Sequence, residues 1–369
     1  MKRNSIVRYL RTVISASIFL STGLLGRQME VAGSDTIKSG QSRVYPLPIL
    51  FYTPETGIAG GAAALYIMRD SASSRPSSIT SDIIYTERKQ VIVELDDDLY
   101  FQGDDYRLLS SILFQRFPNK FFGIGNSTAS DNEETFTPQY FIVRAVLYRK
   151  ILSNFHIAPL IRYESVSMKE VDPAGMLAPG TITGSKGGTS AGLGVVANWD
   201  SRDNTFAASS GGFYQVTGLF YKRAFGGDFN FSDILLDTRN YVEITPAHVF
   251  AFQAAAEFMN GNVPFQDLVR FGGQNIIRGY FDGRYRDKNG IAFQGEYRFP
   301  VWWRFGLIAF AGAAQVANSV GDLAMNRFWF AGGGGLRFSW NPKEHIVIRL
   351  DYGVGNNSSG VYVTVTEAF

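Results

Sequence analysis

The chain repeats one pattern over most of its length: about ten residues of alternating apolar and polar side chains, then residues typical of turns. In the stretch from Ile348 to Tyr352, for example, apolar residues alternate with Arg349 and Asp351. Successive side chains of a β-strand point to opposite faces, so the pattern predicts strands with one apolar and one polar face. No segment sustains the 3.6-residue period of an amphipathic helix. The sequence therefore predicts an all-β protein.

The alternation predicts about sixteen strands, an even number, joined by connections that are alternately short and long. Many of these strands exceed the ~5–6 residues that are usual in soluble proteins, and each is long enough to cross a bilayer at a tilt. The predicted strands are Val44–Tyr52, Gly57–Met68, Ser78–Glu87, Gln90–Gln102, Tyr106–Phe117, Tyr140–Lys150, Phe155–Met168, Ala191–Asp200, Phe213–Arg223, Ser232–Thr245, Val249–Gly261, Ile291–Val301, Phe305–Val316, Phe328–Trp340, His345–Gly355 and Val361–Phe369.

The composition fits strands that face lipid on one side. Aromatic residues make up 14% of the chain, with 30 Phe and 18 Tyr, yet the mean hydropathy is only -0.04. Alternating strands keep the mean hydropathy near neutral while one face stays apolar. Backbone polar groups cannot remain unpaired in lipid, so such a sheet must close on itself. We therefore expect residues 44–369 to form one transmembrane antiparallel β-barrel.

The first 33 residues have the features of a secretory signal peptide. A basic start is followed by a short apolar segment from Val13 to Leu25, and two small-residue tripeptides ending at Gly23 and Gly33 offer alternative cleavage sites. Residues 34–43 then form a short polar linker, expected in the periplasm, that is too short for a folded module. This organisation predicts export and a place in the outer membrane of a Gram-negative cell.

Several classes of chemistry lack support in the sequence. The net charge of +2 gives no sign of nucleic-acid binding. The chain has no cysteine, and His156, His248 and His345 are far apart without metal-ligand spacing. No nucleophile motif or complete phosphate-binding loop is present. We therefore expect no enzymatic activity, no cofactor and no metal.

One stretch, Phe271 to Pro300, differs from the repeating pattern. Its first half reads as a long glycine-containing loop with a central arginine, Arg278, and its second half alternates again as a strand. Glu296 falls on the polar face of that strand. A guanidinium is permanently charged and pairs bidentately with carboxylates, so Arg278 and Glu296 are candidate partners. The alternative is a solvated arginine on a surface loop.

Four residues in this loop, Ile277-Arg278-Gly279-Tyr280, resemble the (Val/Ile)-Arg-Gly-(Phe/Tyr) motif of the BamA/TamA family, the bacterial surface antigen superfamily. The resemblance extends over the chain from about Val44 to Phe369 and places the arginine motif in the sixth outer loop. Further matching segments, in family order, are Asp200-Ser201-Arg202-Asp203-Asn204, Phe271-Gly272-Gly273, Glu296-Tyr297-Arg298-Phe299-Pro300 and Gly335-Leu336-Arg337-Phe338.

The resemblance implies that the sixth loop folds back into the barrel, where carboxylates of the inner wall hold its arginine. Arg278 and Glu296 are then the expected pair, with Gly279 allowing a tight backbone turn. Two departures are visible. Family members commonly carry an Asp in a Phe-x-Asp-x-Gly pattern on the next strand, but the matching segment starting at Phe310 reads Phe-Ala-Gly-Ala-Ala, so a second carboxylate is expected to be missing. The periplasmic POTRA domains of insertases also have no counterpart before Val44.

The final segment carries a further candidate signal. Val361, Val363, Val365 and Phe369 alternate with polar residues, and Phe369 is the last residue of the sequence. This resembles the C-terminal aromatic strand by which outer-membrane barrels are recognised by the barrel assembly machinery. We expect that machinery to insert this chain.

Together these features predict a non-enzymatic outer-membrane barrel that assists insertion or translocation of proteins or lipids through a lateral seam between its first and last strands. The expected partners are outer-membrane lipid, the barrel assembly machinery and a periplasmic or outer-membrane protein. The alternative is a passive, porin-like channel or a structural barrel subunit that works with a separate partner. A lipid-modifying enzyme is a third alternative, which no motif supports.

Overall fold

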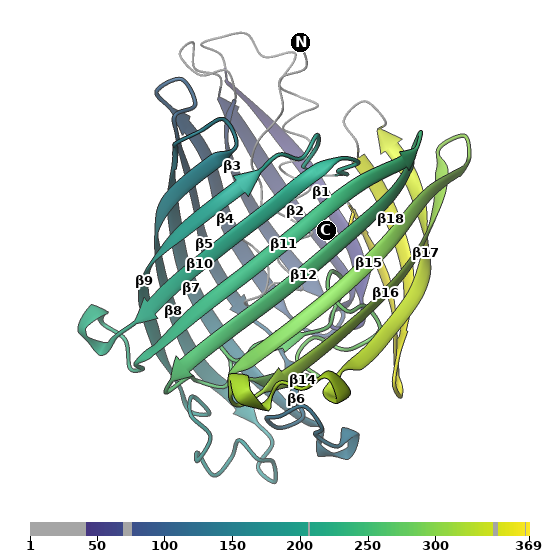
Figure 1. Cartoon of the computed structure of the whole chain (residues 1–369). Coiled ribbons are helices and arrows are strands. Elements are labelled where there is room, and N and C mark those ends of the chain that lie inside the picture. The colour runs from purple at the N-terminus through teal and green to yellow at the C-terminus, as the bar shows by residue number, and fades with distance from the viewer. Residues whose placement is uncertain (1–41, 69–75, 206, 342–345, 366) are drawn as a thin grey trace.

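The computed structural model describes residues 42–68, 76–205, 207–341, 346–365 and 367–369. Sixteen long antiparallel strands form a closed barrel, which confirms the predicted fold (Figure 1). The long strands are β1 (Ser42–Thr53), β2 (Gly57–Met68), β3 (Ser77–Thr86), β4 (Val91–Phe101), β5 (Tyr106–Arg116), β7 (Glu134–Lys150), β8 (Phe155–Val171), β9 (Gly187–Asp200), β10 (Gly211–Tyr221), β11 (Phe231–Thr245), β12 (His248–Gly261), β15 (Asn289–Trp302), β16 (Phe305–Ala317), β17 (Trp329–Asn341), β18 (Ile346–Gly355) and β19 (Ser358–Val365).

Short strands and 3₁₀ turns lie at one end of this barrel. The three-residue strand β6 (Asn119–Phe121) extends the sheet beside β7, and β13 (Val269–Phe271) pairs with β14 (Tyr285–Asp287) in a separate two-stranded sheet. The helices among the described residues are four single 3₁₀ turns, η1 (Ser130–Asn132), η2 (Arg223–Phe225), η3 (Val320–Asp322) and η4 (Met325–Arg327). None of the helices in the described ranges is long and apolar enough to cross a membrane.

The two ends of the barrel differ in their connections. One end, the short-turn rim, carries tight turns such as Pro246–Ala247 and Trp303–Arg304. The opposite end, the long-loop rim, carries the loops 117–133, 172–186 and 262–288 (lower end in Figure 1). Strands β7, β8 and β9 extend farther toward the long-loop rim than the alternation predicted, because their hairpins continue to pair there. Short turns at one rim and long loops at the other are typical of outer-membrane barrels.

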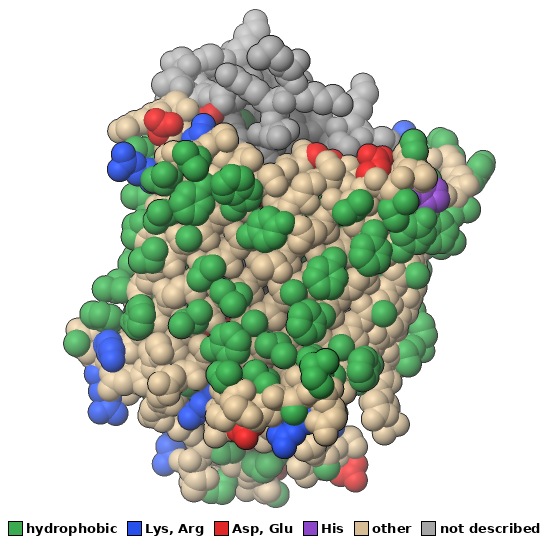
Figure 2. Space-filling view, in the orientation of Figure 1, with side chains coloured by type: hydrophobic (Ala, Val, Ile, Leu, Met, Phe, Trp, Pro, Cys, Tyr) green, Lys and Arg blue, Asp and Glu red, His purple; other side chains and the backbone are tan. Residues whose placement is uncertain are grey.

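The outer wall is an apolar band. Hydrophobic side chains cover the middle of the face in Figure 2, and charged side chains gather toward its two rims. Large apolar residues on this wall, such as Ile83, Val195 and Leu350, are substantially exposed. Residues of the opposite parity, including Arg239 and Gln253, are buried toward the lumen. This distribution, apolar outside and polar inside, is what a strand needs when its outer face contacts lipid.

The barrel closes weakly between its first and last strands. Among the described residues, β1 and β19 share a single register pair, Tyr52 with Val363. By contrast, β1 is in register with β2 along its whole length, from Ser42 to Thr53. We call the β1–β19 contact the seam. Backbone hydrogen bonds along it are therefore far fewer than between other neighbouring strands.

Parts of the predicted organisation lie outside the described residues. The expected signal peptide, residues 1–33, belongs to this part, as does most of the expected linker, residues 34–43. The last two linker residues, Ser42 and Arg43, are the start of β1. At the other end of the chain, β19 stops at Val365, so the predicted strand from Val361 to Phe369 is too long.

Candidate functional site: the inward-folded loop and its charge network

The loop between β12 and β15, residues 262–288 and here named L6, enters the barrel from the long-loop rim. Its apolar side chains Phe265, Val269, Phe271 and Ile277 are almost completely buried. They form one apolar cluster with lumen-facing residues of the barrel wall. L6 is therefore packed inside the barrel, which confirms the inward-folded sixth loop predicted from the sequence.

The Arg278 guanidinium lies at the inner end of this loop and is fully buried. Its Nη2 donates to Glu296 Oε2 at 2.5 Å, and its Nη1 donates to Asp351 Oδ2 at 2.6 Å. The guanidinium carbon also lies 3.7 Å from the ring centre of Phe310, within the range of a cation–π contact. The structure thus brings the two predicted residues, Arg278 and Glu296, into a direct ion pair. We call Arg278, Glu296 and Asp351 the latch.

The latch has two carboxylates, whereas the sequence comparison predicted one. The segment that departs from the family pattern supplies Phe310, whose ring stacks on the guanidinium instead of a carboxylate. The second carboxylate comes from Asp351 on β18, two strands farther around the barrel than β16. The expectation that the second carboxylate is missing was therefore wrong. Asp351 already stood on the polar face of its strand in the sequence, and that parity was the available signal.

The latch belongs to a larger buried charge network on the inner wall of the barrel. Arg337 donates to Asp351 at 2.5 Å and to Glu367 at 2.7 Å, and Arg298 donates to Glu296 at 2.8 Å. The described members of this network are Arg278, Arg298, Arg337, Arg349, Glu296, Asp351 and Glu367. Four guanidinium groups therefore share three side-chain carboxylates. Each of these buried arginines has at least one carboxylate partner that compensates its charge.

Gly279 brings the loop backbone directly onto the last two strands. Its φ of +114° is a conformation that favours glycine, and a Cβ there would lie 2.8 Å from the backbone of Val354 on β18. The Gly279 N–H donates to the Tyr362 hydroxyl at 3.1 Å, and the Ser358 hydroxyl donates to the Gly279 carbonyl at 2.7 Å. Tyr362 and Ser358 both belong to β19. The loop therefore binds the last strand beside the seam.

The flanking motif residues complete this docking. The Tyr280 hydroxyl donates to the Phe330 carbonyl at 3.1 Å and accepts from the Asn356 N–H at 2.8 Å. On the other side, the Ile277 N–H donates to the Gln294 side chain at 3.4 Å. Ile277 has a φ of 54°, which is rare for a β-branched residue. Surrounding packing must hold this conformation, because it is strained in isolation.

L6 also contacts the first hairpin, on the other side of the seam. Glu55 lies in the β1–β2 turn and is 3% exposed. Its Oε1 accepts a hydrogen bond from the Asp282 N–H of L6 at 3.2 Å. Burial, together with the nearby Asp282 carboxylate, raises the pKa of Glu55 to about 7. One loop therefore contacts both β19 and the β1–β2 turn, and no sequence motif marks Glu55.

The last residues of the sequence turn into the lumen. Val361 lies on the outer wall, but Phe369 is 4% exposed and packs with Tyr241, Val249 and other lumen residues. Its main-chain oxygen accepts a hydrogen bond from Arg298 at 2.9 Å. Phe369 is thus not on an outward strand face, because the charge network draws the segment inward through Glu367. Recognition of Val361, Val363, Val365 and Phe369 by an assembly machinery stays a prediction.

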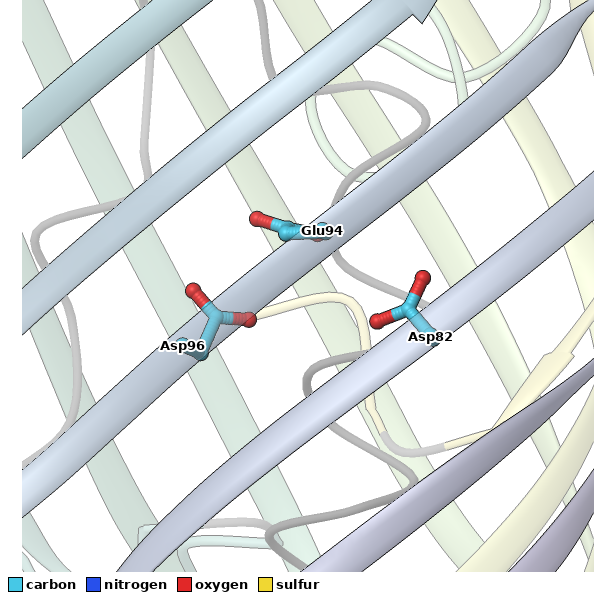
Figure 3. Close-up of side chains that lie close together, drawn as sticks. All are labelled: Asp82, Glu94 and Asp96. Atoms are coloured by element: carbon cyan, nitrogen blue, oxygen red, sulfur yellow. The ribbon is translucent and has the colours of Figure 1, made fainter.

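Three lumen carboxylates also lie close together on β3 and β4. Figure 3 shows Asp82, Glu94 and Asp96 from these neighbouring strands with their carboxyl groups turned toward one another. One ligand oxygen from each lies within 4.8 Å of the others. Acidic groups of this kind are ordinary in barrel lumens, and the sequence predicts no metal site. The cluster assigns no chemistry on its own.

The fold and its charged, loop-filled lumen define a class: β-barrels of the bacterial outer membrane whose sixth outer loop folds inward onto the inner wall. The Omp85 superfamily domain matches residues 82–356 of the chain. The chain therefore belongs to the Omp85 superfamily. Members of this superfamily act in protein insertion or transport, and that general role applies to this barrel. No curated protein sequence gives a significant match.

Three solved structures share the fold at low sequence identity. BamA from Haemophilus ducreyi lacking POTRA domains 1-3 superposes with a TM-score of 0.64 at 13% identity, over 89% of this chain and 71% of that one. CdiB from Acinetobacter baumannii gives 0.56 at 10% identity, over 88% and 59%. CdiB from Escherichia coli gives 0.58 at 10% identity, over 89% and 63%. The chain thus spans less than two thirds of the two CdiB chains.

Proposed function

We propose that this barrel assists insertion or translocation of proteins or lipids at the outer membrane by opening along the seam. The observation that carries this proposal is the single register pair, Tyr52 with Val363, between the first and last strands. Opening elsewhere would break a ladder of backbone hydrogen bonds in a medium without water to replace them. Opening at the seam breaks far fewer such bonds, so separating the strands there has the lowest free-energy cost.

The seam offers a client both a strand edge for backbone pairing and a path into lipid. Edge strands present backbone N–H and C=O groups that act as templates for a further strand. β1 runs from Ser42 to Thr53 but meets β19 in register only at Tyr52, among the described residues. A client strand pairing there would satisfy its own backbone groups while it enters lipid. A lipid chain could cross the same opening without hydrogen bonding.

L6 is the element that holds the seam closed in this proposal. It binds β19 through Gly279 and Tyr362, and it binds the β1–β2 turn through Asp282 and Glu55. The latch fixes the inner end of the loop to β15 and β18. Parting the seam by more than a few ångströms must break one of the two loop contacts. Release of the latch frees the inner end of L6 and so lets the loop give up these two contacts.

The proposed partners follow from this mechanism. Outer-membrane lipid surrounds the barrel, and the barrel assembly machinery inserts the chain itself. A separate periplasmic or outer-membrane protein delivers clients to the short-turn rim, which faces the periplasm in this orientation. The proposed mechanism needs no catalytic group, cofactor or metal, because it uses strand pairing and lateral opening alone.

A disulfide across the seam tests the proposal. The chain has no cysteine, so Tyr52→Cys with Val363→Cys introduces one defined pair. Directly paired antiparallel residues have a Cα separation compatible with a disulfide. The matched control is Ala62→Cys with Ile83→Cys, which are paired between β2 and β3. Both proteins are reconstituted in vesicles and offered an unfolded eight-stranded outer-membrane barrel or a fluorescent phospholipid.

The expected result is loss of client insertion or lipid movement in the oxidised seam variant, recovery after reduction, and no effect of oxidation in the control. Equal activity of the oxidised seam variant would refute lateral opening. A porin-like channel makes the opposite prediction, because large steady currents across a planar bilayer would persist with the seam cross-linked. Absence of such currents supports the loop-filled barrel.

A further inference from the structure

The outer wall contains a trough that the proposed function does not use. It lies over β12, β15 and β16, which face the viewer in Figure 1. The floor of the trough is made of small residues: Gly295, Ala309, Ala311 and Ala313. Gly295 is directly opposite Ala311 in the strand register, so the floor crosses from one strand to the next. The backbone of the wall is thus unusually close to the membrane.

Aromatic side chains form the walls of this trough. Phe250 and Phe252 stand on β12, Phe293 and Tyr297 on β15, and Phe330 on β17. The Phe250, Phe293 and Phe330 rings are substantially exposed. The space between the aromatic rings has a volume of about 610 Å³. Aromatic side chains have few rotamers, so the depression that they enclose has a fixed shape.

The lining selects for hydrocarbon. No charged residue lines the trough. The Tyr297 hydroxyl is already hydrogen-bonded to the His248 ring at 2.8 Å, and Gln294 is buried on the lumen side. The surrounding strands cross the apolar part of the bilayer, so lipid hydrocarbon contacts the trough. A polar ligand would find no partner there.

The size of the trough favours one small occupant over a protein. A volume of 610 Å³ falls within the roughly 300–1,000 Å³ of small-molecule sites, which are mostly apolar and aromatic. A stable protein interface uses about 20–30 residues on each side, more than line this depression. A second copy of the chain would need contacts well beyond the trough. A single lipid chain would not.

We propose that the trough is a binding site for one acyl chain of a membrane lipid. The chain lies along the Ala309–Ala313 floor between the aromatic walls. Bilayer hydrocarbon is as apolar as the trough, so the hydrophobic effect gives no preference for binding. Preference comes from van der Waals contact with rigid rings on both sides of the chain, which disordered lipid neighbours do not supply. The inference does not depend on opening of the seam.

The experiment uses a phosphatidylcholine that carries a diazirine in one acyl chain. The full chain is reconstituted into vesicles containing this lipid, irradiated, digested and mapped by mass spectrometry. Ala311→Phe fills the floor, and Ala309→Leu is a second filling variant. The matched control is Ala145→Phe, which places the same ring on the outer wall of β7, away from the trough. Heat-modifiable mobility in gels checks that each variant is folded.

Labelling of the native protein is expected to concentrate on Phe250, Phe293 and Phe330. Filling the floor removes several carbon contacts, which corresponds to about a threefold loss of labelling at these residues. Ala145→Phe is expected to leave the labelling unchanged. Labelling spread over the outer wall in proportion to exposed area, or unchanged in both filling variants, would overturn the proposal. Protein-to-protein dimers linked through the trough would also overturn it, in favour of a second copy.

Discussion

Glu296→Gln and Arg278→Met are expected to destabilise the barrel unequally, although they remove the two ends of one ion pair. Glu296 accepts from Arg278 at 2.5 Å and from Arg298 at 2.8 Å, and Arg337 lies 3.7 Å away. Neutralising this one carboxylate leaves four buried guanidinium groups with two side-chain carboxylates. Removing Arg278 instead leaves three guanidinium groups with three side-chain carboxylates. Glu296 and Asp351 each keep another arginine partner.

The magnitudes follow from that count. Removing one partner of a buried ion pair typically costs about 3–5 kcal/mol because an uncompensated charge remains, and we expect this cost for Glu296→Gln. Arg278→Met replaces the guanidinium by an apolar chain and loses two charge-assisted hydrogen bonds. We expect about 1–3 kcal/mol for it. The double variant should cost less than the sum, because the two groups share one interaction.

The assay has two readouts. Urea titration in lipid vesicles gives the free energy of unfolding of each variant, and limited proteolysis from outside gives the accessibility of L6. Both variants should expose the loop, because each removes its main contact to β15. Arg278→Met should do so with the smaller loss of stability. Equal stability costs, or a protected loop in both variants, would refute the charge accounting and the latch.

Three other perturbations test separate contacts of the loop. Glu55 has its pKa raised from 4.5 to about 7, so the folded protein binds the proton more tightly than the unfolded chain. Its stabilising contribution, about 3 kcal/mol, is therefore complete below pH 4.5 and lost as the pH rises to 7; thermal unfolding against pH should show this slope, and Glu55→Gln should flatten it. Gly279→Ala should cost at least about 1–3 kcal/mol from backbone strain, measured by urea titration, and a wild-type midpoint would contradict the close approach to Val354. Phe310→Leu should cost about 2 kcal/mol through the lost cation–π contact, and should cost little once Arg278 is already methionine.

The alternation of side chains was sufficient to predict the barrel and the direction of most side chains. The alternation alone placed Arg349 and Asp351 on the inner face of their strand. It also placed Glu296 on the inner face of β15 and Tyr297 on its outer face. Lipid outside and charge inside impose a strict two-residue period, so local sequence carries this information. The arginine motif then identified the loop residue that meets Glu296.

The partners that close the network were not predictable in this way. Asp351 lies 73 residues from Arg278 along the chain, and their contact depends on the shear and closure of the whole sheet. Phe369 continued an alternating pattern, yet it lies in the lumen because Glu367 pairs with Arg337 and Phe369 with Arg298. Glu55 gave no local signal at all. These contacts join segments that only the closed barrel brings together.

Spin labels at the seam test whether L6 holds the first and last strands together. Labels at Tyr52→Cys and Val363→Cys report the width of the seam by pulsed electron resonance, with the loop intact and in the Arg278→Met background. If L6 holds the seam, we expect one short distance with the latch present and a broader, longer distribution without it, with no change for labels at Ala62→Cys and Ile83→Cys. An identical short distance in both backgrounds would show that L6 does not hold the seam.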